Sequence, residues 1–179
     1  ITAGTEDDDY PRINDLGDIA WRRYGFDTNR MQVILLRDGI ETVVKETSRV
    51  YDVEINNLAH LAWSEEHEGE CYVFDEDVYF WDGVAVVQVT TSEPYFDQSP
   101  ALNDFDEIVW THMDICANPW IGNIQAYWDG QIVDLPSVTT QDQGPDINNA
   151  RHVCWIPGGR FVLWRDGELM TLNNSGGSL

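Results

Sequence analysis

One short motif occurs four times in this chain of 179 residues. It begins with an Asn, and a Trp follows seven residues later. The four pairs are Asn14 and Trp21, Asn56 and Trp63, Asn103 and Trp110, and Asn148 and Trp155. An apolar run that ends in Asp-Gly follows each pair, at Asp38, Asp82, Asp129 and Asp166. A spacing kept four times indicates a repeat architecture, in which each copy folds into one supersecondary unit.

The repeat length and the residue types favour β-strands. The steps from one repeat Trp to the next are 42, 47 and 45 residues, a length typical of a four-stranded unit. The segments between turns are short and rich in Val, Ile, Trp, Tyr and Phe, which suit half-buried strands. Because no apolar stripe keeps helical spacing for three turns, we predict an all-β fold with almost no helix.

The second copy shows the unit most clearly. Strands are expected at 51–55, 61–64, 78–81 and 84–90, and Asp82-Gly83 is expected to form a tight hairpin turn. The same pattern predicts one domain of four antiparallel meanders, at residues 10–49, 50–94, 95–142 and 143–172. Residues 1–9 are predicted to be the tail of a repeat or a closing strand, and residues 173–179 a flexible tail.

This layout resembles the β-propeller repeats of the TolB and WD40-like kind. The shared pattern is a proline with an Asn/Asp turn, an apolar strand with an aromatic residue, an apolar strand ending in Asp-Gly and a Thr-rich exit. WD40 signatures are not reproduced in register, although Trp81-Asp82 and Trp128-Asp129 are similar. The resemblance covers about residues 10–172. It implies a propeller-like fold of about four blades, closed alone or through a partner copy, and a binding platform more often than an enzyme.

The charge of the chain restricts its partners. There are 32 acidic and 10 basic residues, a net charge of −22, and Lys45 is the only lysine. Such a surface repels nucleic acid and anionic membranes, so we expect neither as a partner. No run approaches the roughly 18 apolar residues of a spanning helix. We expect an extracellular or secreted protein. The shortage of lysine fits an acidic surface adapted to high salt, and acids gathered around cations are the alternative.

Three of the four repeats have long connections between their second and third strands. The distances from repeat Trp to turn Asp are 17, 19, 19 and 11 residues. Long loops on one face of a rigid scaffold often carry binding sites. We therefore expect a protein or glycan ligand to bind there, through Arg22, Arg23, Tyr24, Phe26, His67, His112 and Trp120. Trp120 departs from the repeat and is the preferred contact, whereas the repeat Trp residues are predicted to be core.

Two acidic clusters suggest a cation site. Asp8 and Asp9 lie in one, Asp75 and Asp77 lie in the other, and carboxylates are ligands that calcium prefers. Neither cluster has the spacing of a calcium-binding loop. Calcium is therefore the one cofactor that the sequence suggests, and a solvated acidic surface is the competing interpretation.

Three functions remain open. The favoured one is a non-enzymatic binding module, because no nucleophile elbow, phosphate loop or zinc-helix motif occurs. A carbohydrate-active hydrolase or lyase is the second, because His67 and His112 lie beside acids and could act as an acid–base pair. The third is a structural subunit that completes a larger propeller, for example as a homodimer.

The three cysteines match no metal-binding spacing. Cys71 and Cys116 occupy equivalent connections of neighbouring repeats, so a disulfide between them is an open possibility. Cys154, beside Trp155, is expected to be a small buried apolar residue.

Overall fold

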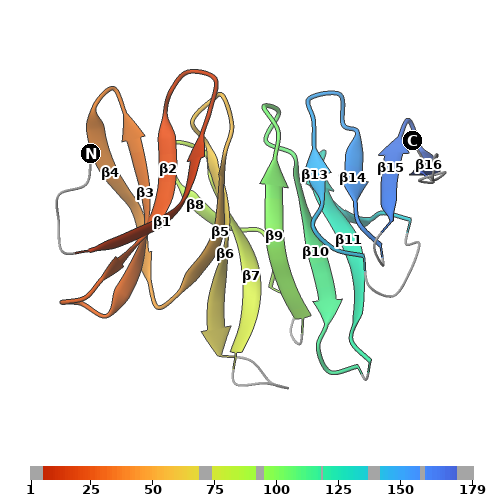
Figure 1. The fold of residues 1–179 in the computed structure, drawn as a ribbon, viewed down its shortest axis with the longest axis horizontal. Helices are drawn as coiled ribbons and strands as arrows, with labels where there is room; N and C mark the ends of the chain where they lie inside the picture. Colours follow the sequence, from red (N-terminus) through yellow and green to blue (C-terminus); the bar gives the residue numbers. More distant parts are fainter. Residues whose placement is uncertain are drawn as a thin grey trace, which may run out of the picture.

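The computed structural model describes residues 6–68, 74–91, 95–117, 119–136, 142–157 and 160–172. These residues form 16 β-strands and no helix (Figure 1), which confirms the all-β prediction. Over the same ranges, no helix has the length and the hydropathy that a membrane span requires.

The strands form three sheets. The first contains β1 (Asp7–Ile13), β2 (Ile19–Gly25), β3 (Arg30–Arg37) and β4 (Ile40–Thr47). The second contains β5 (Val50–Ile55), β6 (Leu61–Glu68), β7 (Phe74–Trp81), β8 (Val86–Gln88), β9 (Tyr95–Leu102), β10 (Ile108–Asp114), β11 (Ile121–Trp128) and β12 (Gln131–Asp134). The third contains β13 (Asp146–Ile147), β14 (Val153–Trp155), β15 (Phe161–Arg165) and β16 (Glu168–Leu172).

The eight-stranded sheet consists of two units. Within β5–β8 and within β9–β12, consecutive strands pair in antiparallel fashion. One parallel pair, Glu76 with Phe96, joins β7 to β9. The described chain is thus a succession of four antiparallel meanders, which we number first to fourth, and Figure 1 shows them side by side in chain order.

The repeat Asn closes the turn between the first and second strands of every meander. In the first meander, the Asn14 side-chain oxygen accepts hydrogen bonds from the backbone N–H groups of Leu16 and Asp18, at 3.0 and 2.9 Å. The same pair of contacts recurs at Asn56, Asn103 and Asn148. The role of this Asn is structural, because its side chain satisfies backbone groups of a tight turn.

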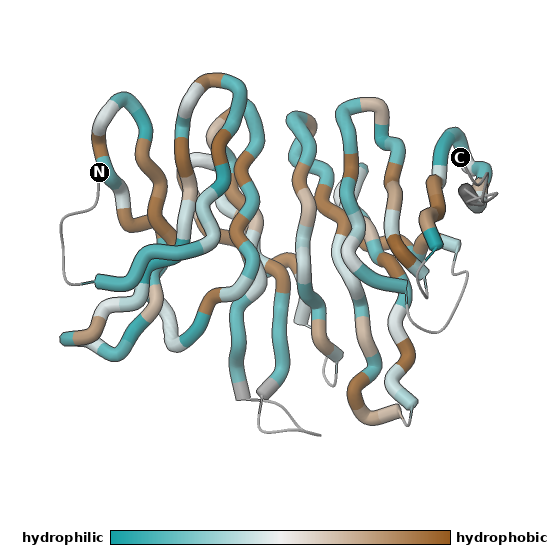
Figure 2. Tube along the Cα trace, in the orientation of Figure 1, coloured by the Kyte–Doolittle hydropathy of each residue, from teal (hydrophilic) through white to brown (hydrophobic). Residues whose placement is uncertain are grey.

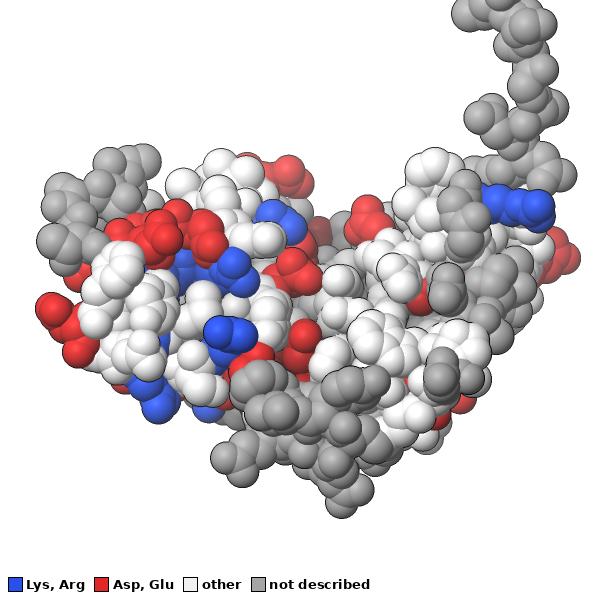
Figure 3. Space-filling model, turned by 60° about the horizontal axis from the view of Figure 1, so that its bottom comes forward, with Lys and Arg blue, Asp and Glu red and all other residues white. Residues whose placement is uncertain are grey.

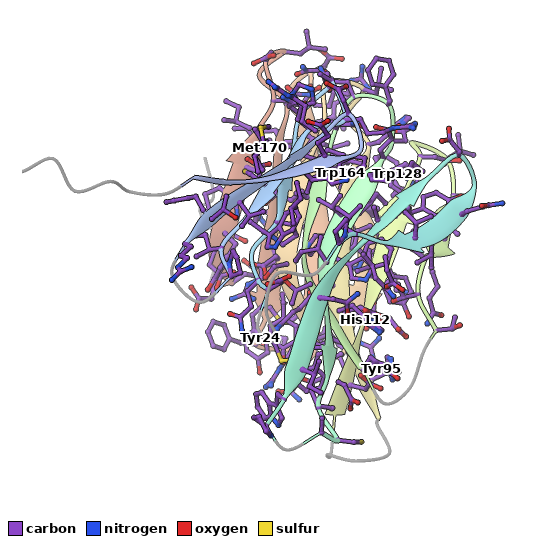
Figure 4. The ribbon with its side chains drawn as sticks, turned by 90° about the vertical axis from the view of Figure 1, so that its right-hand side faces the viewer. Tyr24, Tyr95, His112, Trp128, Trp164 and Met170 are labelled. Carbon is purple, nitrogen blue, oxygen red and sulfur yellow. The ribbon has the colours of Figure 1, made fainter. Side chains whose placement is uncertain are left out.

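The apolar core lies between neighbouring meanders. Trp63 packs against Ala20 and Leu35 of the first meander, and Trp110 packs against Ala62 and Val78 of the second. Trp155 likewise packs against the third meander, in a cluster with Val109, Ile124 and Ala126. Further out in this last interface, Trp128 and Trp164 stack at 5.5 Å (Figure 4). The predicted core role of the repeat Trp residues is confirmed.

The predicted long loops are, in large part, strands. β6 and β7 stay paired well beyond the repeat Trp, with Glu65 opposite Asp77 and His67 opposite Asp75. Figure 2 shows the hydrophilic character of this end of both strands. Placing His67 on a loop was wrong, because a strand needs only backbone pairing and its polar side chains can satisfy one another. In the first meander only residues 26–29 separate β2 from β3.

Two further expectations are corrected or completed. Asp7, Asp8 and Asp9 pair with β2 as part of the first strand, not as a separate closing segment.

Cys116 is disulfide-bonded, whereas Cys154 is a free, half-buried thiol. Cys71, the partner suggested by the sequence, lies outside the described residues, as does the tail at 173–179.

Candidate functional site

The first strands of the four meanders line a common hollow. β1 contacts β5, β5 contacts β9, and β9 contacts β13. Figure 3 shows the molecule as an arc with a hollow between its two ends. A cavity of about 390 Å³ lies among these first strands and the segment that leads into β13.

Charged side chains from three of the first strands meet in this cavity. Asp52 and Glu54 come from β5, Asp146 from β13 and Arg12 from β1. Arg12 Nε donates to Glu54 Oε1 at 2.7 Å, and Ser99 Oγ donates to Asp52 Oδ2 at 3.1 Å. Burial raises the pKa of Glu54, Arg12 opposes this effect, and the charges of Asp52 and Asp146 add to it. Three carboxylates and one guanidinium group therefore line the cavity, which leaves it with an excess of negative charge.

A second polar region lies along β6 and β7. Its acidic side chains are almost fully buried, and they are Glu65, Glu66, Asp75, Glu76 and Asp77. Burial raises the pKa of Glu76 to about 7; the Ser64 hydroxyl opposes the rise, and Asp52, Glu66 and Asp75 contribute to it. Glu66 accepts a hydrogen bond from the Tyr51 hydroxyl and lies 3.4 Å from Arg49. These contacts compensate part of the cost of burying carboxylates.

His67 and His112, the two histidines proposed as an acid–base pair, each contact a different carboxylate. His67 Nε2 lies 2.6 Å from Asp77 Oδ2. His112 Nδ1 lies 2.6 Å from Asp97 Oδ1, and its ring stacks on Tyr95 at 4.2 Å (Figure 4). Asp97 also accepts a hydrogen bond from Trp110 Nε1 at 2.9 Å. We call Asp97, Trp110 and His112 the Asp97 triad.

The structure does not bring His67 and His112 together. Side chains two residues apart on a strand share a face, so His67 lies on the face of Trp63, and His112 on the face of Trp110. Trp63 packs on the first meander and Trp110 on the second. The two histidines therefore belong to separate interfaces.

The first meander contains the counterpart of the Asp97 triad. Asp8 accepts from Trp21 Nε1 at 2.9 Å and from Arg23 Nε at 2.7 Å, and the sequence spacing is the same. Since an arginine takes the place of the histidine there, the shared role is to anchor the first strand to the second. Sequence reasoning missed Asp97; the signal was an Asp 13 residues before the repeat Trp, with a basic residue two after it.

Of the seven predicted ligand-binding residues, four are engaged inside the molecule. Besides the two histidines, Arg22 pairs with Asp9 and donates to Val50 O at 3.0 Å, while Arg23 pairs with Asp8 and Glu41. The arginine side chains are only 15% and 14% exposed.

The remaining three are aromatic, and two of them are exposed. Phe26 is 60% and Trp120 47% exposed. Tyr24 meets Phe26 edge-on at 5.1 Å and donates to Asn29 Oδ1 at 2.5 Å. Tyr24 and Phe26 belong to the first meander and Trp120 to the third, so the aromatic residues come from two separate hairpins.

The acids predicted to bind calcium have other partners. Arginine side chains pair with Asp8 and Asp9, and Asp77 accepts from Thr90 and Gln88 as well as contacting His67. Asp75 accepts from the backbone N–H of Glu76 at 2.9 Å. In the part of the chain that the structure describes, no three His, Cys, Asp or Glu side chains are grouped to hold a metal ion.

Comparison with known proteins places the fold. No family model matches the chain, and no curated protein matches it. Among solved structures, acylaminoacyl peptidase from Pyrococcus horikoshii matches with a TM-score of 0.65 at 15% identity, over 95% of this chain and 27% of the peptidase. The β-propeller domain of the Trilobed protease from Pyrococcus furiosus matches with a TM-score of 0.52 at 11% identity, over 94% of this chain and 71% of that domain.

The fold is β-propeller-like. A gluconolactonase from Xanthomonas campestris also matches, with a TM-score of 0.53 at 11% identity, over 92% of this chain and 61% of the enzyme. At these identities the likeness extends to the fold alone. In propellers the blades surround a central channel. We therefore call the cavity between Arg12, Asp52, Glu54 and Asp146 the axial cavity.

Proposed function

We propose that the chain is a non-enzymatic binding module whose axial cavity takes a cationic group of a protein partner. In this proposal the four meanders are propeller blades of the TolB and WD40-like kind that the repeat pattern resembles. The observation that carries it is the excess of carboxylates over guanidinium groups in the cavity.

The charges in the axial cavity favour a lysine or arginine side chain as the ligand. Arg12 neutralises Glu54, but Asp52 is bonded to the uncharged Ser99 hydroxyl, and Asp146 is exposed. A cationic head would supply charge-assisted hydrogen bonds to both. The net charge of −22 would also raise the rate at which a basic partner arrives.

Two observations favour a basic protein segment over the alternatives. The described residues that line the axial cavity include no aromatic ring, the group on which a sugar would stack. His67 and His112 lie in separate interfaces, so they do not form the acid–base pair that the hydrolase or lyase hypothesis requires.

The test is the binding of a fluorescent hexalysine peptide, followed by anisotropy. Binding should weaken as salt is added, and the double variant Asp52→Asn/Asp146→Asn should weaken it by at least about tenfold, roughly 1.4 kcal/mol. The matched control is Asp38→Asn/Asp166→Asn. It removes the same charge from two turns outside the axial cavity, where the backbone has φ of 52° and 53° and Asn is well tolerated.

Equal losses in the two double variants would mean that the peptide responds to net charge alone, and the axial cavity would then not be the site. Absence of binding at low salt would equally overturn the proposal.

A further inference from the structure

The same interface occurs three times along the chain. In each case, the face of one meander that carries the repeat Trp packs on the preceding meander. It covers the face of that meander that points away from its own repeat Trp. The residue just before the repeat Trp belongs to the covered face. It is fully buried in the first three meanders, as Ala20, Ala62 and Val109.

The fourth meander presents the same kind of face, and among the described residues no further meander covers it. Cys154, the residue before Trp155, is half-buried and not fully buried. It pairs with Leu163, which pairs with Met170, and Phe161 is 58% exposed on the same side. None of these four apolar side chains belongs to the three buried clusters of the described residues. We call Cys154, Phe161, Leu163 and Met170 the terminal face.

A row of hydrogen bonds connects the first turns of the four meanders, and each meander donates to the one that follows it. We call this row the Asn ladder. The amide of Asn14 donates to the backbone oxygen of Asn56 at 3.0 Å. Asn56 donates in the same way to Asn103 at 3.0 Å, and Asn103 to Asn148 at 3.2 Å. A second row runs beside it, in which the backbone N–H of the residue after each Asn donates to the next repeat. These contacts are Asp15 to Asn57, Asn57 to Asp104, and Asp104 to Asn149.

The two ends of this ladder are complementary. At the fourth meander, the Asn148 amide and the Asn149 backbone N–H have no onward acceptor among the described residues, and both residues are exposed. The first three ladder Asn residues are at most 9% exposed. At the first meander, the Asn14 backbone oxygen and the Asp15 carboxylate occupy the positions that accept such bonds elsewhere in the ladder.

We infer that the terminal face binds the first meander of a second copy of this chain, so that two copies close head to tail into one ring. Each copy has hydrogen-bond donors on its fourth meander, the donor end, and acceptors on its first meander, the acceptor end. In a ring of two copies, the donor end of each copy contacts the acceptor end of the other, so the same contact occurs twice. The arc of Figure 3 leaves its hollow open on one side, and the second copy would enclose it. This inference does not depend on what the axial cavity binds.

Sedimentation velocity of the full chain over a range of protein concentrations tests the inference. We expect a monomer–dimer equilibrium. Because both copies carry a charge of −22, added KCl should favour the dimer by screening their repulsion. Met170→Lys should weaken the dimer by at least about tenfold. The matched control Val84→Lys, at a residue 89% exposed in another region, should not.

A mixing experiment separates a head-to-tail contact from a symmetric one. Asp15→Lys disrupts the acceptor end, as Met170→Lys disrupts the donor end, and each variant alone should be monomeric. Mixed together, they should form a heterodimer through the one intact junction. The reactivity of the Cys154 thiol gives an independent measurement, because the dimer buries it.

A wild-type chain that stays monomeric at high salt and high concentration would overturn the inference. So would a dimer that Met170→Lys leaves unchanged, a mixture that fails to associate, or assemblies larger than two copies.

Discussion

Glu76 lies on β7 among other carboxylates, and its burial raises its pKa to about 7 from an ordinary 4.5. The folded state therefore binds a proton that the unfolded state has lost between these two pH values. The stability that this residue contributes is complete below pH of about 4.5 and is lost as the pH rises through about 7.

The variant Glu76→Gln should remove this loss. It should exceed the wild type in free energy of unfolding by up to about 3 kcal/mol at pH of about 8, and by much less at acidic pH. Urea denaturation across this pH range measures the difference. Glu168→Gln, a change at an exposed residue, is the control. A constant offset between wild type and Glu76→Gln at every pH would contradict the raised pKa.

Two tryptophans of the third meander should respond differently to truncation. Trp110 is fully buried and donates to Asp97, so Trp110→Ala should cost about 3 to 5 kcal/mol. Trp120 is 47% exposed in the connection between β10 and β11, so Trp120→Ala should change the free energy of unfolding by about 0.5 kcal/mol or less. Guanidinium denaturation compares them, and a large loss at Trp120 would place it in the core.

At the scale of the strand and turn, the ladder Asn residues differ in what they support. Asn56 caps its own turn and also donates to Asn103 O and Asp106 Oδ1, at 3.0 and 2.9 Å. Asn148 caps its turn but is exposed. Asn56→Ala should therefore destabilise the chain by about 3 kcal/mol and Asn148→Ala by about 1 kcal/mol. Urea titrations under conditions that keep the chain monomeric make the comparison; equal losses would show that capping alone matters.

The meanders themselves could be predicted from the sequence, because each depends on local signals. Asn56 marks the first turn, and Asp82-Gly83 marks the hairpin between β7 and β8. These signals act within a few residues and recur in every copy.

What the sequence did not show depends on partners distant along the chain. The polar residues of β6 resembled a loop, since nothing local indicated that Glu65 would lie opposite Asp77. Arg22 and Arg23 resembled a binding patch because their acids belong to a neighbouring strand. The axial cavity was missed for the same reason, because its charges come from β1, β5 and β13, which meet only in the assembled arc.

At the scale of the whole molecule, the dominant electrostatic fact is the charge of −22. Mutual repulsion of the acids opposes the compact state, so salt should raise the thermal midpoint by screening. After treatment with a chelator, calcium chloride and potassium chloride at matched ionic strength should give similar midpoints, since the described residues hold no grouped metal ligands. A saturating rise specific to calcium would instead identify a built cation site.

The Asn ladder also bears on how such a chain can change its length. Every junction contains the same contact from an Asn side-chain amide of one repeat to the Asn backbone oxygen of the next, so this contact does not distinguish one junction from another. If one whole repeat were duplicated in tandem, the new copy could form this contact with the repeat before it and with the repeat after it. A partial duplication would lack one of these contacts. In evolution or in engineering, this architecture favours the gain and loss of complete repeats.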